Sequence, residues 1–172
     1  MKRNTALALG ITAGVALVAT ELARGRRLHV CLEMERETSL SPEAVIGEVS
    51  HVEREPGMIP FVRRVKVLET GMDWVRYRVD GSTYGFSWWV QYRKVWDYEK
   101  SIVKWSSERG SYGIQNSGRL MIIPGADKNI IRLETGYSVH AAAIGRVLES
   151  AMRPVLTYAF VEWMDALAGG NV

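Results

Sequence analysis

Hydrophobic and polar positions alternate from His29 to Leu40. The two rows of this alternation are Val30, Leu32, Met34 and Arg36 on one side and Cys31, Glu33, Glu35 and Glu37 on the other. A period of two residues is typical of a β-strand that turns one face to the protein interior and the other to water. The pattern therefore predicts a first strand over these residues.

Signals for a helix start follow this strand directly. Ser41 can cap a helix, Pro42 suits the first helical position, and Glu43 complements the positive helix end. We expect the helix to run from Pro42 to about His51. Prolines and a glycine between residues 56 and 60 break this pattern and leave room for only one further short helical turn.

Residues 62 to 139 show strand after strand, separated by short turn signals. These signals are Thr70-Gly71, Asp80-Gly81, Asp97-Tyr98, Arg109-Gly110 and Pro124-Gly125-Ala126-Asp127. Six strands fit between and around them. Because the connections are too short for crossover helices, the strands must follow one another as an antiparallel meander.

Charged side chains indicate which face of each strand meets water. Arg132 and Glu134, for example, are expected to face water, which turns Leu133 inward. The residues expected to face inward are Val75, Tyr77, Val79, Val103, Trp105, Leu120, Ile122, Ile131, Leu133, Thr135 and Tyr137. The strand near residues 86 to 93 stays undecided, because both of its rows carry large aromatic residues. Those rows are Phe86, Trp88, Val90 and Tyr92 against Trp89, Gln91 and Arg93.

The periodicity becomes helical after Val139. Apolar residues recur on one face at Ile144, Leu148, Met152, Val155, Ala159 and Trp163. This spacing predicts a long C-terminal helix that ends at about Ala168. Pro154 lies inside it and is expected to kink it, which would let the helix follow a curved sheet.

An uncharged apolar segment precedes all of these elements. It covers 17 residues, from Asn4 to Thr20, and Arg24, Arg26 and Arg27 follow it. As a helix it would span about 25 Å, at the short end for crossing a bilayer. We expect an uncleaved, single-pass N-terminal membrane anchor. The alternative is an export signal that is cleaved, although the sequence offers only a poor cleavage site.

Two features of this segment bear on its partners. Gly10 and Gly14 form a GxxxG spacing that lets two transmembrane helices approach closely, so a helix partner is one interpretation. Small residues are also common in such segments without any partner. Basic residues flank the segment on both sides, so the side of the membrane stays undecided.

Composition and charge exclude several classes of function. A net charge of +3, with basic residues spread along the chain, lacks the dense basic stripe of a nucleic-acid-binding protein. The single cysteine, Cys31, and three separated histidines cannot form a recognisable metal site, so we expect no metal. No glycine-rich phosphate loop appears, and we expect no cofactor.

The order of one strand, two short helices, six strands and a long closing helix resembles the helix-grip fold. The resemblance is to the START-like superfamily (SRPBCC, Bet v 1-type), in its polyketide cyclase/dehydrase and coenzyme Q-binding branch. It covers about residues 29 to 168. The segments that carry it are Ser41-Pro42-Glu43-Ala44-Val45, Pro60-Phe61, Val65 to Glu69, Ile102 to Trp105, Gly118 to Pro124, Ile131 to Glu134 and Tyr137.

The resemblance implies an α+β fold with a seven-stranded curved antiparallel sheet around a long C-terminal helix. Together with the anchor, it divides the chain into a membrane anchor with its basic flank (1–28), a ligand-binding domain (29–168) and a flexible tail (169–172). Members of the superfamily bind or process hydrophobic molecules between sheet and helix. The residues expected to line such a site are Tyr77, Phe86, Trp88, Tyr92, Trp105, Leu120, Ile122, Leu133, Tyr137, Leu148, Met152 and Val155.

The sequence favours binding over catalysis and assigns no catalytic residue. Our expectation is a membrane-anchored binding protein for a lipid, an isoprenoid quinone or a polyketide-like molecule. Arg93 and Gln91 could orient a carbonyl or carboxylate, and His140 is more typical of a surface or helix-capping residue than of a cavity mouth. Two alternatives stay open, namely an aromatase/cyclase-type enzyme and an accessory subunit of a membrane protein complex.

Overall fold

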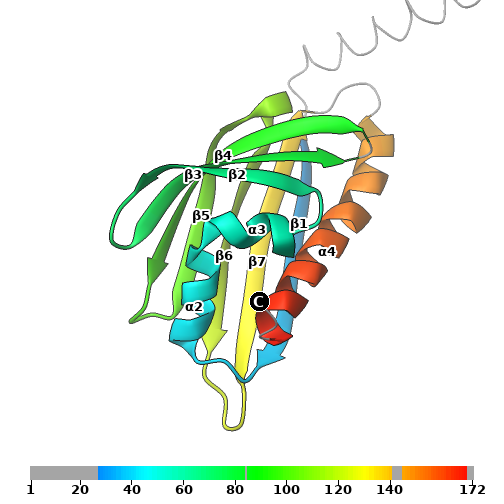
Figure 1. Ribbon diagram of the computed structural model, residues 1–172. Coiled ribbons are helices and arrows are strands. Elements are labelled where there is room, and N and C mark those ends of the chain that lie inside the picture. Colours follow the sequence, from blue (N-terminus) through cyan, green and yellow to red (C-terminus); the bar gives the residue numbers. More distant parts are fainter. Residues whose placement is uncertain (1–26, 84, 141–144, 170–172) are drawn as a thin grey trace, which may run out of the picture.

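The computed structural model describes residues 27–83, 85–140 and 145–169 (Figure 1). In chain order the elements are β1 (Arg27–Thr38), α2 (Pro42–Ser50), η1 (Val52–Arg54), α3 (Glu55–Met58), β2 (Val62–Thr70), β3 (Trp74–Thr83), β4 (Phe86–Asp97), β5 (Ile102–Gly110), η2 (Ser111–Gly113), β6 (Gln115–Ile123), β7 (Asn129–His140) and α4 (Gly145–Gly169). None of the helices in these ranges is long and apolar enough to span a membrane. The predicted N-terminal transmembrane helix lies outside the described residues.

All seven strands form one antiparallel sheet in the order β1-β7-β6-β5-β4-β3-β2. The six strands from β2 to β7 follow one another as a meander, and β1 pairs with β7 to complete the sheet. Figure 1 shows the sheet curving around α2, α3 and α4, which all lie on one side of it. The predicted α+β architecture is therefore confirmed in the part of the chain that the structure describes.

Charge identified the faces of the strands correctly. Residues on the inner face, such as Val79, Leu133 and Leu120, are at most 3% exposed, whereas the charged residues between them reach the surface. The undecided strand, β4, turns Trp88, Val90 and Tyr92 inward, because Val90 and Tyr92 lie opposite Val79 and Tyr77 of β3. The inner face is the floor on which the helices pack.

One predicted turn is wrong. Asp80 and Gly81 lie inside β3, and the chain reverses instead at Gly85, whose φ is +82°. Gly81 pairs with Trp88 across the two strands, and a Cβ at this position would overlap the Trp88 ring. The glycine therefore makes room for an indole. In the sequence alone, a glycine with this role cannot be distinguished from a glycine in a turn.

The helices begin as predicted, with one difference. The Ser41 side chain accepts a hydrogen bond from the Ala44 backbone N–H at 3.2 Å, and Pro42 occupies the first turn of α2. After α2, however, the chain forms both a 3-10 turn and a short α-helix rather than one turn. Pro56 lies in the first turn of α3, where its missing N–H has no intrahelical partner to lose, so it starts this helix instead of breaking it.

Candidate functional site

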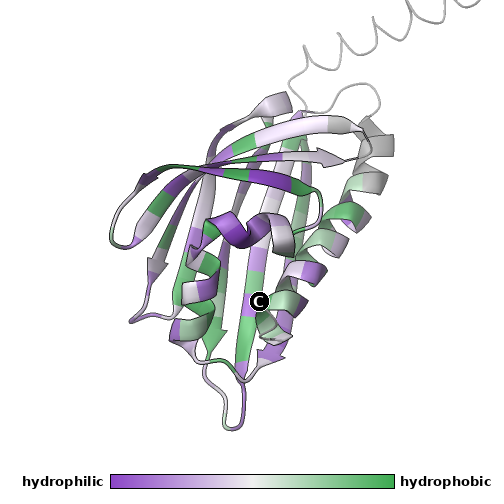
Figure 2. Cartoon of the chain, viewed as in Figure 1, coloured by the Kyte–Doolittle hydropathy of each residue, from purple (hydrophilic) through white to green (hydrophobic). Residues whose placement is uncertain are grey.

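The inner face of the sheet divides into two halves that differ in the side chains that line them. In the half toward the C-terminal end of β1, which we call the sealed half, aliphatic side chains of β5 to β7 pack against α2 and the end of α4. Its residues are Val103, Leu120, Ile122, Ile131 and Leu133 of the sheet, Val45, Ile46 and Val49 of α2, and Trp163, Met164 and Leu167 of α4. None of them is more than 4% exposed. Figure 2 shows these hydrophobic residues gathered on the lower parts of the strands and on α2.

The other half of the inner face, which we call the aromatic half, is rich in aromatic residues. Tyr77 and Tyr92 face each other across β3 and β4, and their rings stack with centroids 5.5 Å apart. Trp88 and Tyr137 are only half-buried, although they pack against the core. Leu156 of α4 is also half-buried and packs against the core. This half therefore has apolar side chains that the described residues do not seal from solvent.

A belt of polar side chains crosses the inner face between the two halves. We call it the polar belt, and it consists of Tyr77, Tyr92, Lys94, Asn116 and Tyr137. The Tyr92 and Tyr137 hydroxyls lie 3.4 Å apart, although these residues come from β4 and β7. Asn116 and Tyr137 are direct partners in the register of β6 and β7. Five groups that can hydrogen bond thus converge from four strands on an otherwise apolar surface.

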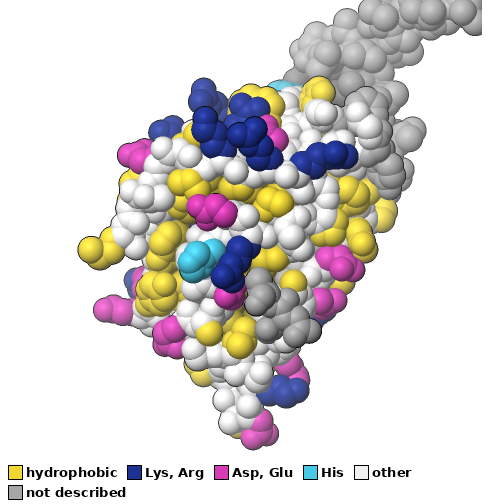
Figure 3. All heavy atoms as spheres, viewed as in Figure 1, with side chains coloured by type: hydrophobic (Ala, Val, Ile, Leu, Met, Phe, Trp, Pro, Cys, Tyr) yellow, Lys and Arg dark blue, Asp and Glu magenta, His cyan; other side chains and the backbone are white. Residues whose placement is uncertain are grey.

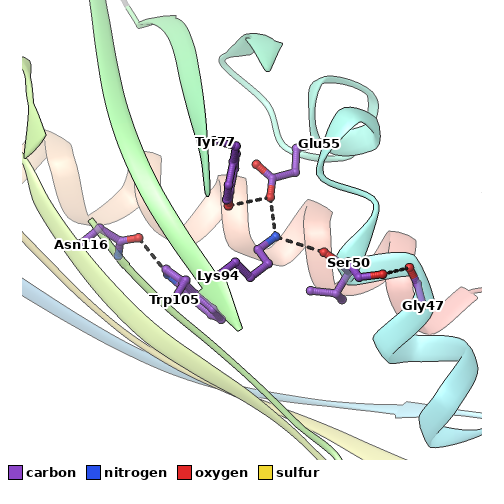
Figure 4. A network of polar contacts seen from close by, with 8 residues as sticks. Gly47, Ser50, Glu55, Tyr77, Lys94, Trp105 and Asn116 are labelled. Atoms are coloured by element: carbon purple, nitrogen blue, oxygen red, sulfur yellow. Dashed lines mark hydrogen bonds and ion pairs between the residues drawn. The ribbon is translucent and has the colours of Figure 1, made fainter. Parts of the chain in front are cut away.

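Lys94 is the charged member of the belt. It follows Tyr92 on the inner row of β4, its side chain is 2% exposed, and its Nζ donates to Glu55 Oε1 at 2.6 Å and to the Val49 carbonyl at 3.1 Å. The Tyr77 hydroxyl donates to the same Glu55 oxygen at 3.0 Å. Figure 4 shows the three side chains meeting between the strands and the short helices. The ion pair therefore joins α2 and α3 to the centre of the sheet.

Sequence reasoning missed both members of this ion pair. Lys94 could have been found, because it continues the row of Trp88, Val90 and Tyr92 once that row is known to face inward. Glu55 could not have been found from the sequence, since a carboxylate beside Pro56 is typical of the first turn of a surface helix. Its burial depends on how α3 packs across the sheet.

Asn116 forms the second cluster of hydrogen bonds in the belt. It accepts a hydrogen bond from Trp105 Nε1 at 2.9 Å and donates through Nδ2 to Thr135 Oγ1 and to the Gly136 carbonyl, each at 2.9 Å. The Trp105 ring crosses Gly118 of the neighbouring strand, where a Cβ would overlap it. Asn116 therefore holds the indole in one orientation against the sheet.

Burial controls the ionisation of the three tyrosines. Loss of contact with water raises the pKa of Tyr77 well above its ordinary value, and the negative charge of Glu55 raises it further. The pKa of Tyr92 is also raised well above its ordinary value, by burial first and then by Tyr137. Burial likewise raises the pKa of Tyr137. All three phenols therefore remain protonated at neutral pH and can donate hydrogen bonds.

The belt has capacity left for a ligand. Every buried side-chain nitrogen and oxygen among the described residues has a hydrogen-bond partner, so none of them is unsatisfied in the absence of a ligand. Lys94 uses two of the three donors of an ammonium group. A phenol oxygen can accept as well as donate. By the types of its donors and acceptors, the belt is suited to a carbonyl, hydroxyl or carboxylate.

The structure places the predicted ligand-binding residues as follows. Tyr77, Tyr92, Trp105, Leu120, Ile122 and Leu133 are buried on the inner face, Trp88 and Tyr137 are half-buried there, and Met152 and Val155 are half-buried on α4. The side chains of Phe86 and Leu148 lie outside the described residues. Leu120, Ile122 and Leu133 belong to the sealed half, within the same core cluster as Tyr77, Tyr92 and Trp105. The binding role of the set stays a prediction.

Three other candidates from the sequence lie away from the inner face. Arg93 and Gln91 point to the outer face of β4, where Gln91 donates to Glu108 and accepts from Arg109. His140 is exposed at the end of β7, 3.4 Å from the Arg27 guanidinium. No group of three metal-ligating side chains occurs within the residues that the structure describes.

Two surface hollows lie on the outer face of the sheet. The larger, about 630 Å³, runs along a row of short side chains formed by Cys31, Gly136 and Ser117. The second, about 350 Å³, adjoins it around Ser106 and Ser138. Both are shallow troughs, because longer side chains such as Glu33 and Arg119 border the row. Short side chains line both hollows, and charged side chains border the larger one.

Solved structures share this architecture. A protein of Thermus thermophilus superposes with a TM-score of 0.73 at 16% identity, over 81% of this chain and 95% of that one. The Zhui aromatase/cyclase of a Streptomyces species gives 0.70 at 14% identity, over 83% and 93%. A START superfamily protein of Mycobacterium smegmatis gives 0.64 at 17% identity, over 83% and 96%.

This chain has the START-like helix-grip fold. At these identities the likeness establishes the fold and leaves the activity to be argued from the site. No family model matches the sequence, and no curated protein matches it. The expected resemblance is thus confirmed by structure, with polyketide aromatase/cyclases among the neighbours.

Proposed function

We propose that the protein binds a hydrophobic small molecule against the aromatic half of the inner face, beneath the N-terminal part of α4. The observation that supports this most directly is half-buried apolar surface on the inner side of the sheet, presented by Trp88 and Tyr137 on the strands and by Leu156 on α4. Apolar surface next to a few orienting polar groups is the usual composition of a small-molecule site.

The polar belt suggests the chemistry of the ligand. Stacked tyrosine rings favour a flat or unsaturated apolar body. Three protonated phenols and the Lys94 ammonium favour a ligand whose one polar end accepts hydrogen bonds, such as a carbonyl or carboxylate. Isoprenoid quinones and polyketide-like molecules have both properties.

We further propose that the apolar segment 4–20 anchors the protein in a membrane as a single-pass helix. The support is sequence alone, an uncharged run followed by Arg24, Arg26 and Arg27. Such an anchor would keep the site near a bilayer, where hydrophobic ligands concentrate.

Mass spectrometry of the protein from membranes tests the anchor, because an intact N-terminus supports the anchor and a cleaved one supports export. Cross-linking through cysteines placed at Gly10 or Gly14 would detect a helix partner.

Extraction of bound molecules tests the ligand proposal. The full chain is purified in mild detergent, extracted with organic solvent and analysed by mass spectrometry. We expect one class of hydrophobic molecule at near-stoichiometric amounts. Leu156→Trp adds bulk to the half-buried surface that the proposal assigns to the ligand, and it should reduce the bound amount at least about tenfold. A wild-type protein that purifies empty would contradict the proposal.

A matched variant controls for the added tryptophan. Leu68→Trp makes the same change on β2, at an exposed position (43%). It should leave the bound amount unchanged. Tyr137→Phe, which keeps the size of the side chain, separates loss of a hydrogen bond from loss of folding. If both leucine variants lose the ligand equally, the site does not lie under α4.

The convergence of Lys94, Glu55 and three tyrosines favours one alternative, an aromatase/cyclase-type enzyme. An amine, a carboxylate and phenols within one belt could move protons during a cyclisation. The alternative predicts that a linear poly-β-ketone is converted with loss of water, and that Tyr92→Phe slows this conversion. Recovery of the compound unchanged after binding would favour the binding function.

A further inference from the structure

The outer side of strands β2 to β4 carries a dense group of cations. We call it the basic face, and its members are Arg64, Lys66, Arg76, Arg78 and Arg93. They come from three segments that are separate in sequence, so only the fold gathers them. Figure 3 shows Lys and Arg side chains clustered at the upper end of the molecule, the end at which β1 begins in Figure 1.

Two features of the basic face are unfavourable for the fold by itself. Lys66 lies directly opposite Arg78, and Arg76 lies directly opposite Arg93, in the register of adjacent strands. Like charges in such cross-strand pairs destabilise a sheet. Two such pairs of like charges side by side indicate a surface that is arranged for an anionic partner rather than for stability alone.

Carboxylates neutralise only part of this charge. Arg78 pairs with Asp80 at 2.7 Å, and Arg76 pairs with Glu108 at 2.7 Å and with Glu69 at 3.9 Å. The other three cations of the basic face are exposed, and no carboxylate among the described residues lies within 4.0 Å of them. A net positive surface therefore remains on this side of the sheet. On β1, at the other end of the sheet, the outer row carries glutamates instead.

Two tryptophans lie under the cations. The Arg78 guanidinium stacks 4.7 Å from the centre of the Trp89 ring, and the Arg93 guanidinium stacks 4.7 Å from the centre of the Trp74 ring. Single-stranded nucleic acids bind through bases that stack on free aromatic faces. Here each of these rings already has an arginine on one face, which disfavours that partner. Arginine beside tryptophan is instead typical of the headgroup region of a bilayer.

We propose that the basic face docks on a bilayer surface that contains anionic lipids. The apolar run 4–20 precedes β1 by only a few residues, which would keep the basic face within reach of headgroups. This inference goes beyond the ligand site, because it concerns the outer side of the sheet. It gives the domain a preferred orientation on the membrane from which a hydrophobic ligand is taken.

Vesicle flotation tests the proposal with the full chain. Every protein in this experiment carries Ile11→Asp and Val15→Asp. These changes prevent insertion of the apolar run into the bilayer, which would otherwise mask weaker docking by the basic face. The vesicles are phosphatidylcholine alone or phosphatidylcholine with about 30% phosphatidylglycerol, a fraction at which basic clusters bind measurably. We expect flotation only with the anionic vesicles, and its loss when salt is raised from about 0.1 M to about 0.5 M.

A charge reversal and its matched control localise the effect. Arg64→Glu, Lys66→Glu and Arg93→Glu together should weaken vesicle binding about a hundredfold, since each basic residue near the surface contributes roughly fivefold. Arg54→Glu, Lys100→Glu and Lys128→Glu change the net charge equally on other parts of the surface and should have little effect. All six positions are exposed. Circular dichroism verifies folding of both triple variants.

Three outcomes would overturn the proposal. They are equal loss of flotation in the two triple variants, flotation that does not depend on phosphatidylglycerol or salt, and binding of a short single-stranded RNA without binding of vesicles. The triple variant of the basic face should still carry its hydrophobic molecule in the extraction experiment. Failure of docking and failure of the ligand site are therefore distinguishable.

Discussion

Lys94 places a positive charge in the protein interior, and the surrounding hydrogen bonds compensate for its loss of water. Its Nζ binds Glu55 and the Val49 carbonyl, and both charged side chains are almost completely buried. Removing one partner of such a pair leaves the other charge uncompensated, which is far more costly than the net stability of the pair itself. The pair therefore ties α2 and α3 to the sheet.

Lys94→Met tests this account. We expect a loss of about 3–5 kcal/mol in the free energy of unfolding, because Glu55 would remain buried without a cation. The double variant Lys94→Met with Glu55→Gln should be more stable than the single one. Lys104→Met provides the control, since Lys104 is exposed on the outer face of β5 and should change stability by less than about 0.5 kcal/mol. Denaturant titration measures all three, and equal losses for Lys94 and Lys104 would refute the account.

The three tyrosines of the polar belt give stability a dependence on alkaline pH. Their pKa values are raised in the folded state, so above about pH 10 the unfolded chain loses protons that the folded chain keeps. The stabilisation is complete below the unfolded pKa and is lost as pH rises through the window up to the folded pKa. The free energy of unfolding should fall by up to about 1.4 kcal/mol per pH unit for each tyrosine.

Denaturant titrations between pH 8 and pH 11 measure this slope. Tyr92→Phe should make the slope shallower, because one buried phenol no longer titrates. Tyr112→Phe should leave it unchanged, since Tyr112 is 63% exposed. An identical slope in wild type and Tyr92→Phe would show that burial does not control this ionisation.

Individual residues differ in how far the sequence predicts their place. Tyr77, Trp105 and Tyr137 were assigned to the inner face, because charged neighbours alternate with them. Lys94 shows the limit of that reasoning, since the same rule assigns every lysine to water. Only the tertiary approach of α3 provides the carboxylate that makes its inward position possible.

At the scale of elements, two glycines in the sheet make room for tryptophan rings. Gly81 admits Trp88, and Gly118 admits Trp105 from the adjacent strand. Both indoles can then lie flat along the inner face and still donate hydrogen bonds, Trp88 to Thr83 at 3.0 Å and Trp105 to Asn116 at 2.9 Å. The strands adapt to the rings through the absence of a Cβ.

Gly118→Ala tests this role. The added methyl group would overlap the Trp105 ring and the Glu134 backbone carbonyl, so we expect a loss of about 1–3 kcal/mol, as for other overpacking changes. Gly136→Ala is the matched control on the next strand, because its Cβ would meet no atom within 4 Å. Thermal unfolding of the two variants compares them, and a smaller loss for Gly118→Ala would exclude the steric role.

Hydrophobic patterning was sufficient to predict the order and type of the helices and strands. Alternation located the strands, and the change to a helical period located α4, because both patterns follow from burial on one side. It failed at Asp80-Gly81, where a glycine inside a strand looks like a turn. It also missed much of the packing face of α4, since Leu156, Phe160, Met164 and Leu167 lie beside the predicted stripe. A curved sheet covers a wider part of the helix than one narrow stripe.

For the whole molecule, the fold supplies what the linear sequence conceals. Cations spread along the chain gave no sign of a nucleic-acid site, yet three strands bring five of them together on the basic face. The polar belt likewise collects residues from four strands. The resemblance to START-like proteins predicted the architecture correctly, whereas the burial of each side chain on the inner face became visible only in the structure.

The central claim is that an apolar ligand occupies the aromatic half of the inner face. Indole N–H signals in two-dimensional NMR test it most directly, because the tryptophans lie on both faces. The delipidated full chain is titrated with the molecule extracted from the native protein. We predict shifts for Trp88 and Trp105 on the inner face and none for Trp74 and Trp89 on the outer face. Shifts confined to Trp74 and Trp89 would contradict the claim.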